Sequence, residues 1–154
     1  MQNTLKMIVA ASFVTCGFIS ALGQGKTERK IVKLPGGAPP IAPISPAIVV
    51  GDLVFTSGQI GIDPKTGQMV EGGTEQQAEQ VFKNLAAVLE AAGSDMSLVV
   101  KATVFLADMN DYQAMNQIYR NHFKQDFPAR SAVQVAKLPA NARIEIECIA
   151  VLKK

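Results

Sequence analysis

Tryptophan is absent from this chain of 154 residues, and histidine, cysteine and tyrosine are rare, with one, two and two copies. So few histidines and cysteines form no cluster at the spacing of a metal site. The sequence also lacks a glycine-rich loop that opens a helix, because Gly72-Gly73 does not have the pattern of a phosphate-binding loop. We therefore expect no metal site.

Charge of one sign is not in excess either. The chain has 15 lysines and arginines against 13 aspartates and glutamates, a formal net charge of +2. A net charge close to zero gives no electrostatic footprint for binding the phosphate backbone of RNA or DNA. We therefore expect no nucleic-acid partner.

Only one apolar run is long, Met7–Leu22, with 16 residues and no charge. A membrane-spanning helix needs about 20 apolar residues, and Ala21-Leu22-Gly23 has the small residues that a signal peptidase prefers. We interpret residues 1–23 as a signal peptide and expect an exported protein, periplasmic or secreted, without stable membrane association after cleavage. One alternative is an uncleaved membrane anchor. Another is a lipoprotein modified at Cys16, although Val14-Thr15 is a poor sequence to precede a modified cysteine.

The remainder has the length of one domain. Residues 24–44 are predicted to form an extended arm, because the stretch Leu34–Pro46 contains five of the eight prolines. Residues 45–154 are predicted to form the domain. Cys148 is the one cysteine left after cleavage, so stability must come from the core and from oligomerisation instead of a disulfide.

Hydrophobic periodicity predicts two helices in this domain. The first begins at Thr74, with Gln77 completing a capping box, and ends at Gly93. The second begins at a similar box, Asn110 with Gln113. The predicted strands cover residues 47–50, 53–57, 98–107, 131–136 and 143–152, of which 98–107 is expected to be buried on both faces. This order predicts an α+β fold, a mixed β-sheet with two helices packed on one face.

The last strand alternates in a way that predicts assembly. Ile144, Ile146, Cys148, Ala150 and Leu152 point to one face, and we expect that face to meet the helices. The opposite face carries charged side chains together with Ile149 and Val151. Two helices cannot cover both faces of a sheet, and an uncovered apolar patch usually marks a protein interface. We expect this second face to be buried against other copies of the chain.

Arg130 and Glu145 are the candidate catalytic pair, an arginine at a strand entrance and a carboxylate expected on the neighbouring strand. A guanidinium binds a carboxylate through two parallel hydrogen bonds, which lysine cannot do. Both residues also have structural explanations. Arg130 is of a type usually found solvated or in a salt bridge at the surface, and Glu145 can pair with Arg143 or with a cation on a neighbouring strand. His122 is expected to be a packing residue.

Three further residues are candidates for substrate binding. Ser57 and Gly58 combine a hydroxyl group with a flexible backbone, although such a serine more often caps a strand end. Asn116 lies off the apolar stripe of its helix, so it either faces solvent or reaches a neighbouring site.

Several motifs, taken in order, resemble the RidA family of imine deaminases. They are Phe55-Thr56-Ser57-Gly58-Gln59-Ile60, Asn116-x-x-Tyr119, Phe127-Pro128-Ala129-Arg130-Ser131, Val135-Ala136-Lys137-Leu138-Pro139 and Ile144-Glu145-Ile146-Glu147. The resemblance implies a chorismate-mutase-like homotrimer with clefts between subunits. It also implies cofactor-independent hydrolysis of 2-imino or enamine acids to 2-keto acids and ammonia.

By position, the resemblance gives each candidate a role. Arg130 would bind the substrate carboxylate and Glu145 would position or deprotonate water. Ser57 and Gly58 would line the cleft, and Asn116 would approach from the helix side. The alternatives are a trimer that binds small carboxylates without catalysis and a holdase-like or ribonuclease protein.

The sequence departs from the family at two positions. Ala47 is expected to replace a tyrosine that closes over the ligand, which would leave a wider pocket. Ala132 stands where many members have a cysteine, so regulation through a thiol is not expected there.

Overall fold

The structure, a computed structural model, describes residues 28–35, 43–124 and 126–154. The segment 1–23, interpreted as a signal peptide, lies outside the described residues. The strands and helices are β1 (Arg29–Val32), β2 (Ala47–Val50), β3 (Leu53–Thr56), β4 (Gln59–Ile60), β5 (Ile62–Asp63), β6 (Gln68–Met69), α1 (Thr74–Ala92), β7 (Val99–Leu106), α2 (Tyr112–His122), β8 (Ala129–Gln134) and β9 (Ile144–Val151), with short 3-10 helices at Met96–Leu98, Met109–Asp111 and Pro139–Asn141.

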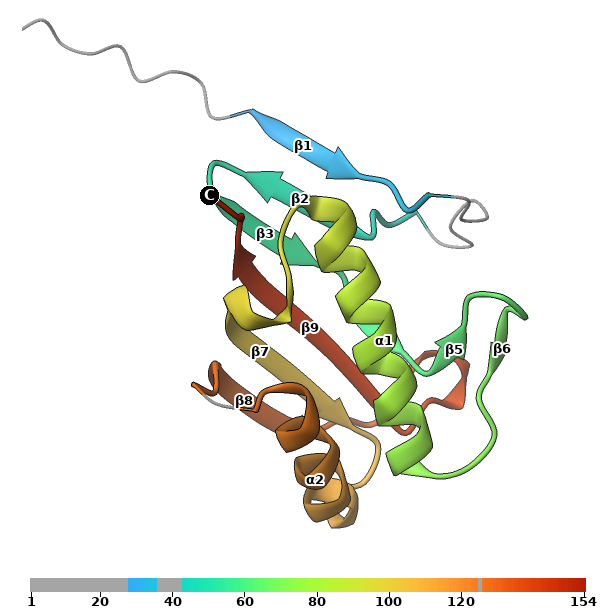
Figure 1. Cartoon of the computed structure of the whole chain (residues 1–154). Coiled ribbons are helices and arrows are strands. Elements are labelled where there is room, and N and C mark those ends of the chain that lie inside the picture. Colours follow the sequence, from blue (N-terminus) through green and yellow to red (C-terminus); the bar gives the residue numbers. More distant parts are fainter. Residues whose placement is uncertain (1–27, 36–42, 125) are drawn as a thin grey trace, which may run out of the picture.

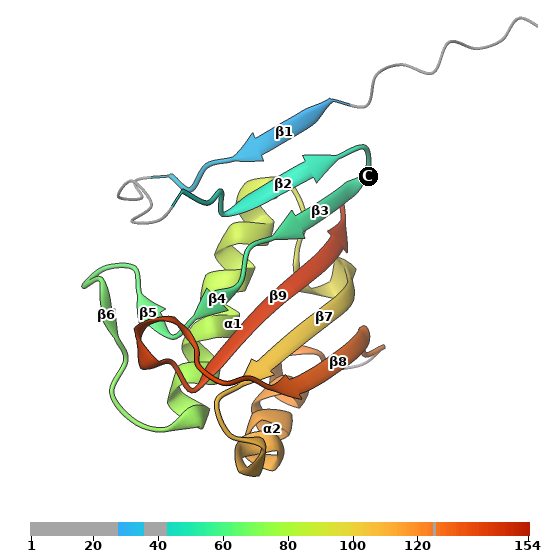
Figure 2. The same ribbon diagram turned by 180° about the vertical axis from the view of Figure 1, so that it is seen from behind.

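The main sheet has the strand order β1-β2-β3-β9-β7-β8, and β4 continues the pairing of β3 along β9. Only β7 and β8 run parallel; the other pairings are antiparallel. Both long helices cover the same face of this sheet, and the view from behind shows the opposite face without a helix (Figures 1 and 2). The predicted α+β class, a mixed sheet with two helices on one face, is confirmed.

The sheet begins earlier in the chain than expected. Residues 29–32, which fall inside the predicted arm 24–44, form β1 and pair with β2 as an edge strand. Val32 from this strand is buried in the core. The apolar Ile31-Val32 pair is therefore a strand signal that belongs to the domain.

Helix α1 provides the largest share of the core. Its apolar stripe is buried as the periodicity predicted, and Gly93 ends the helix with a φ of 84°, a left-handed conformation that glycine adopts without strain. The buried side chains of the stripe are Ala78, Val81, Phe82, Leu85, Val88 and Leu89. They pack on inward residues of the sheet, which include Val54, Val104, Ile144 and Ile146.

The predicted capping box at the start of α1 is wrong by one residue. The cap is Gly73, whose N–H donates to Oε1 of Gln76 at 2.8 Å. Thr74 and Gln77 are instead buried at the contacts with other elements. Gln77 Oε1 accepts a hydrogen bond of 2.8 Å from the backbone N–H of Arg143, so it aligns the start of β9 against α1.

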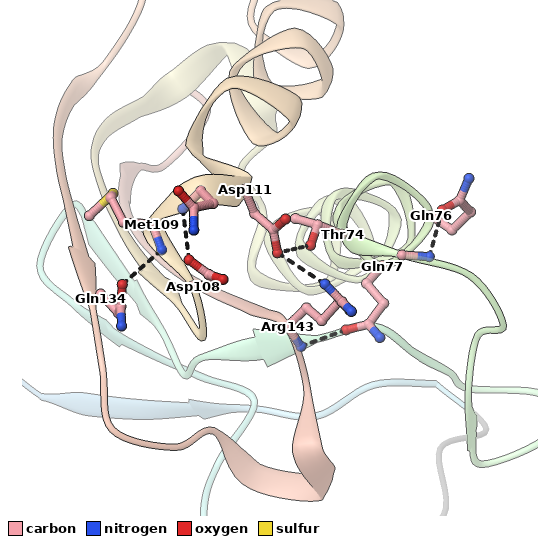
Figure 3. Close-up of polar contacts among 10 residues, drawn as sticks. Thr74, Gln76, Gln77, Asp108, Met109, Asp111, Gln134 and Arg143 are labelled. Carbon is pink, nitrogen blue, oxygen red and sulfur yellow. Dashed lines mark hydrogen bonds and ion pairs between the residues drawn. The ribbon is translucent and has the colours of Figure 1, made fainter.

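The start of α2 also differs from the prediction. Asn110 and Gln113 form no box, because the helix begins at Tyr112 and Asp111 is its cap without a side-chain capping bond. The Asp111 carboxylate accepts a hydrogen bond from Thr74 Oγ1 and lies 3.3 Å from Nη1 of Arg143 (Figure 3). One carboxylate thus joins α1, α2 and the entrance of β9.

The alternation in β9 is confirmed. Ile144, Ile146, Cys148 and Ala150 are buried under the helices, and the residues between them are half-buried on the other face. In β7 the same alternation replaces the expected burial on both faces, because no element covers its second face (Figure 2). Among the described residues, no helix combines the length and apolar character needed to cross a membrane.

Candidate active site

Arg130 is held by aromatic side chains of α2. Its guanidinium carbon lies 4.4 Å from the ring centroid of Tyr119 and 5.6 Å from that of Tyr112. Nη2 donates to the Tyr112 hydroxyl at 3.2 Å, and Nη1 lies 3.6 Å from the Met115 sulfur. A guanidinium over an aromatic ring is stabilised electrostatically and loses little freedom when it binds a planar anion.

The charge of this arginine has no carboxylate partner among the described residues. This differs from the surface ion pair that an arginine of this kind usually forms. A half-buried guanidinium that is fixed but not neutralised is suited to an external anion.

A hollow of about 370 Å³ opens beside Arg130. Its volume lies in the range of sites for small molecules. The lining residues come from α2, β8 and the segment between them: Tyr112, Asn116, Tyr119, Arg120, Phe127, Pro128 and Arg130. Asn116 therefore borders the same space as Arg130. Of the two placements expected for it, facing solvent or reaching a neighbouring site, this is the second.

Glu145 lies elsewhere, against the turn between β3 and β4. A Cβ atom added at Gly58 would lie 1.8 Å from Glu145 Oε1, so the carboxylate occupies the space that a side chain at Gly58 would need. Ser57 adjoins this contact, but its hydroxyl donates to the Ser45 carbonyl at 2.7 Å and its N–H to the Pro46 carbonyl at 2.9 Å. Ser57 thus fixes the entry into β2, and its oxygen keeps only acceptor capacity for a ligand.

The environment of Glu145 favours its protonated form. Burial raises the pKa of this carboxyl above its ordinary value, and the negative charge of nearby Glu147 raises it further. Arg143, the other partner expected for this carboxylate, pairs with Asp111 instead. A carboxylate with a raised pKa is a better proton acceptor near neutral pH than an ordinary one.

The expected pairing of Arg130 with Glu145 on neighbouring strands is wrong for a single chain. Strand β7 lies between β8 and β9. Arg130 is in register with Ala102 on the face under the helices, whereas Glu145 is in register with Phe105, three residues further along β7. Side chains alternate along a strand, so the two groups leave opposite faces of the sheet.

Ala47 does not border the site, contrary to expectation. Its side chain is 1% exposed, in the core of β2 opposite Thr56. Ile44, in contrast, is 54% exposed, and it directly precedes Ser45, whose carbonyl accepts the hydrogen bond from Ser57.

Sequence reasoning missed the two tyrosines that hold Arg130. Tyr119 stands out in the sequence only as part of a motif, and Tyr112 belongs to none of the motifs. The signal that could have found them is their i, i+7 spacing, which places both on one face of a helix two turns apart. Which strand this face meets is decided by tertiary packing.

The remaining candidates for chemistry are structural. His122 stacks on Phe82 with ring centroids 4.4 Å apart, and its Nε2 lies 2.9 Å from Oε2 of Glu79, which agrees with a packing role. Burial raises the pKa of the Cys148 thiol to about 12, so it stays protonated at neutral pH. In the part of the chain that the structure describes, no group of three potential ligands is arranged to hold a metal ion.

Two helices on one face of a mixed sheet, with a fixed arginine at a small hollow, define an α+β protein with a candidate site for a small anion. A family model described as Endoribonuclease L-PSP matches residues 36–152. The chain belongs to this family, which includes the RidA proteins that its motifs resemble.

Relatives and solved structures agree with this assignment. Human 2-iminobutanoate/2-iminopropanoate deaminase is 47% identical over 123 residues, 80% of this chain and 90% of the human one. Reactive Intermediate Deaminase A, chloroplastic, from Arabidopsis thaliana is 44% identical over 132 residues, 86% of this chain and 71% of the plant one. The crystal structure of RidA from a Psychrobacter species superposes with a TM-score of 0.76 at 39% identity, covering 80% of this chain and 99% of the other.

The expectation of an exported, periplasmic protein is wrong. The relatives come from human, mouse and fruit fly, and the plant relative is named chloroplastic, which does not fit export to a periplasm. The error rested on one apolar run, Met7–Leu22, and such a run is a compositional signal that identifies no compartment by itself.

Proposed function

We propose that the protein hydrolyses small 2-imino acids, or the enamines in equilibrium with them, to 2-keto acids and ammonia. The oxygen of water bonds to the carbon of the C=N group while one of its protons goes to the nitrogen. The remaining hydroxyl proton then moves to the nitrogen as the C–N bond breaks, so that the C=O group of the keto acid forms and ammonia leaves. Human, mouse and rat relatives named 2-iminobutanoate/2-iminopropanoate deaminase support this reaction class. The observation that carries the proposal is the fixed, unneutralised guanidinium of Arg130 at a hollow of small-molecule size.

Arg130 binds the substrate carboxylate in this proposal. Its contacts with Tyr112 and Tyr119 orient the planar group before the ligand arrives, which lowers the entropy cost of binding. Asn116 lines the same hollow and offers an amide that can donate to the imine acid or accept from it. The fixed carboxylate places the C=N carbon at a defined distance from the rest of the cleft.

Glu145 accepts the proton from the attacking water. Its raised pKa supports this role, because a general base works best when its pKa approaches the working pH. Gly58 is needed beside it, since a larger residue would occupy the space of the carboxylate. Ser57 contributes mainly by holding the turn that carries Gly58.

The active unit is an oligomer, for which we propose a homotrimer with one cleft at each subunit interface. Arg130 and Glu145 leave opposite faces of the sheet, so a ligand of a few carbon atoms can meet both only if they come from two copies. The uncovered face also exposes apolar side chains, with Leu53 and Phe55 each 39% and Val133 44% exposed. Such a patch is typical of an interface.

The test is the decay of freshly generated 2-iminopropionate with the wild-type protein and with Arg130→Ala. We expect the wild type to accelerate hydrolysis and the variant to lose the acceleration. Equal hydrolysis by both proteins would contradict the proposal.

Binding measurements distinguish this activity from two other functions, carboxylate binding without catalysis and cleavage of RNA. A trimer that only binds small carboxylates would bind pyruvate in calorimetry through Arg130 and leave the imine untouched. A ribonuclease, the activity in the family's description, requires RNA binding that weakens with salt. We expect no such binding, because the net charge is close to neutral.

A further inference from the structure

We propose that the hydroxyl group of Tyr112 is a second binding group for the substrate carboxylate and restricts the site to 2-imino acids with a free acid group. The inference rests on the proposed function, because it takes Arg130 as the carboxylate-binding residue. It adds to the proposed site a residue that none of the sequence motifs contains. It also assigns to this residue the selectivity for an acid over the corresponding amide.

The hydrogen-bond chemistry of the two side chains supports this assignment. A guanidinium has only donors, so in the 3.2 Å contact with Arg130 Nη2 the Tyr112 oxygen is the acceptor. The phenolic O–H then remains available as a donor. A carboxylate on the Arg130 guanidinium can accept from the arginine through one oxygen and from Tyr112 through the other. An amide presents one oxygen and an NH2 group that only donates, so its single oxygen would have to accept from both side chains while the NH2 group faces one of the two donors.

The position of Tyr112 is fixed from both sides. Tyr112 is the first residue of α2 and follows Asp111, whose carboxylate is bound by Thr74 and Arg143 (Figure 3). On the other side, Arg130 is seated on the ring of Tyr119. Two groups that are each anchored by a separate contact keep their spacing without a ligand, which is the preorganisation that selective binding requires.

Tyr112 also borders the space where the ligand would lie. It lines the hollow of about 370 Å³ together with Arg130 and Asn116. By contrast, the hydroxyl of Tyr119 is buried and has no hydrogen-bond partner among the described residues. Of the two tyrosines that hold Arg130, Tyr112 is therefore the one whose hydroxyl is placed for a ligand.

The experiment compares Tyr112→Phe with the wild type on matched ligands. Hydrogen bonds to charged groups are worth more than neutral ones, so we expect KM for 2-iminopropionate and the Kd of pyruvate each to rise about tenfold or more. The turnover number kcat should change little, because Tyr112 acts on binding. Binding of pyruvamide, which lacks the carboxylate, should stay as weak as in the wild type, so that the preference for acid over amide falls.

Two controls separate this role from a structural one. Gln113→Ala changes an exposed neighbour on the same helix and should alter the binding of neither ligand. Unchanged oligomeric state and Tm of Tyr112→Phe would show that the fold survives. Pyruvate binding by Tyr112→Phe that equals the wild type would overturn the inference, and so would an equal loss for pyruvate and pyruvamide. Retained activity in Arg130→Ala would instead overturn the proposed function.

Discussion

Arg130 and Glu145 leave opposite faces of one sheet, although only strand β7 separates the strands that carry them. Arg130 lies under the helices against Tyr112 and Tyr119, and Glu145 lies on the bare face against Gly58. A single chain therefore presents the two groups of the proposed site on separate faces, each as one half-site. A small ligand can contact both only where the half-site of one copy meets the other half-site of a second copy.

This arrangement predicts complementation between inactive variants. Arg130→Ala and Glu145→Gln should each be inactive alone, yet subunits mixed by co-refolding in equal amounts should regain about a quarter of wild-type activity, because about a quarter of random interfaces join two intact half-sites. The measurement is imine hydrolysis before and after mixing. If both residues act within one subunit, mixing will restore nothing.

Replacement of Arg130 by lysine should be nearly as damaging as replacement by alanine. Lysine keeps the charge but loses the planar fork and the stacking on Tyr119. We expect the Kd of pyruvate to rise at least about tenfold. Calorimetry checks this, and pyruvate binding within a factor of about two of wild type would show that charge alone is recognised.

Glu147→Gln should shift the pH profile of the reaction. The charge of Glu147 contributes to the raised pKa of Glu145, so its removal lowers that pKa. Glu145 must be deprotonated to act as a base, and the acidic limb of kcat should therefore move to lower pH. Glu90→Gln, an exposed change on α1, should leave the limb in place. A shift to higher pH would contradict this role for Glu145.

Gly58→Ala should lower kcat more than it raises KM. The added Cβ would lie 1.8 Å from Glu145 Oε1, so the carboxylate must move away from its position. The matched change Gly73→Ala adds a Cβ whose nearest neighbour is at 3.7 Å and should leave kcat close to the wild-type value. Steady-state kinetics of the two variants test the difference. Equal kcat values would mean that the position of Glu145 is not critical.

Tyr119→Phe should make the protein more stable. Burial raises the pKa of Tyr119 to about 12, and its hydroxyl has no partner among the described residues. An unsatisfied buried hydroxyl destabilises a fold, so its removal should increase the free energy of unfolding by about 1 kcal/mol. Denaturant unfolding measures this. A loss of stability would show that the hydroxyl finds a partner in the assembled protein.

The sequence alone determined the main helices and strands and the family. The apolar stripe that ends at Gly93 predicted α1, and the alternation from Ile144 to Ala150 predicted which face of β9 is buried. These signals are local, because helix and strand periods follow from backbone geometry. The motifs around Arg130 and Glu145 likewise indicated the RidA family, since a motif is a property of the chain and needs no tertiary contact to be recognised.

Only the tertiary structure decided how the elements combine into a site. Strand order placed β7 between β8 and β9, two strands that follow one another along the chain. This separated Arg130 from Glu145. Helix packing brought Tyr112 to Arg130, and β2 took Ala47 into the core. These outcomes depend on contacts between residues far apart in sequence, which no local period records.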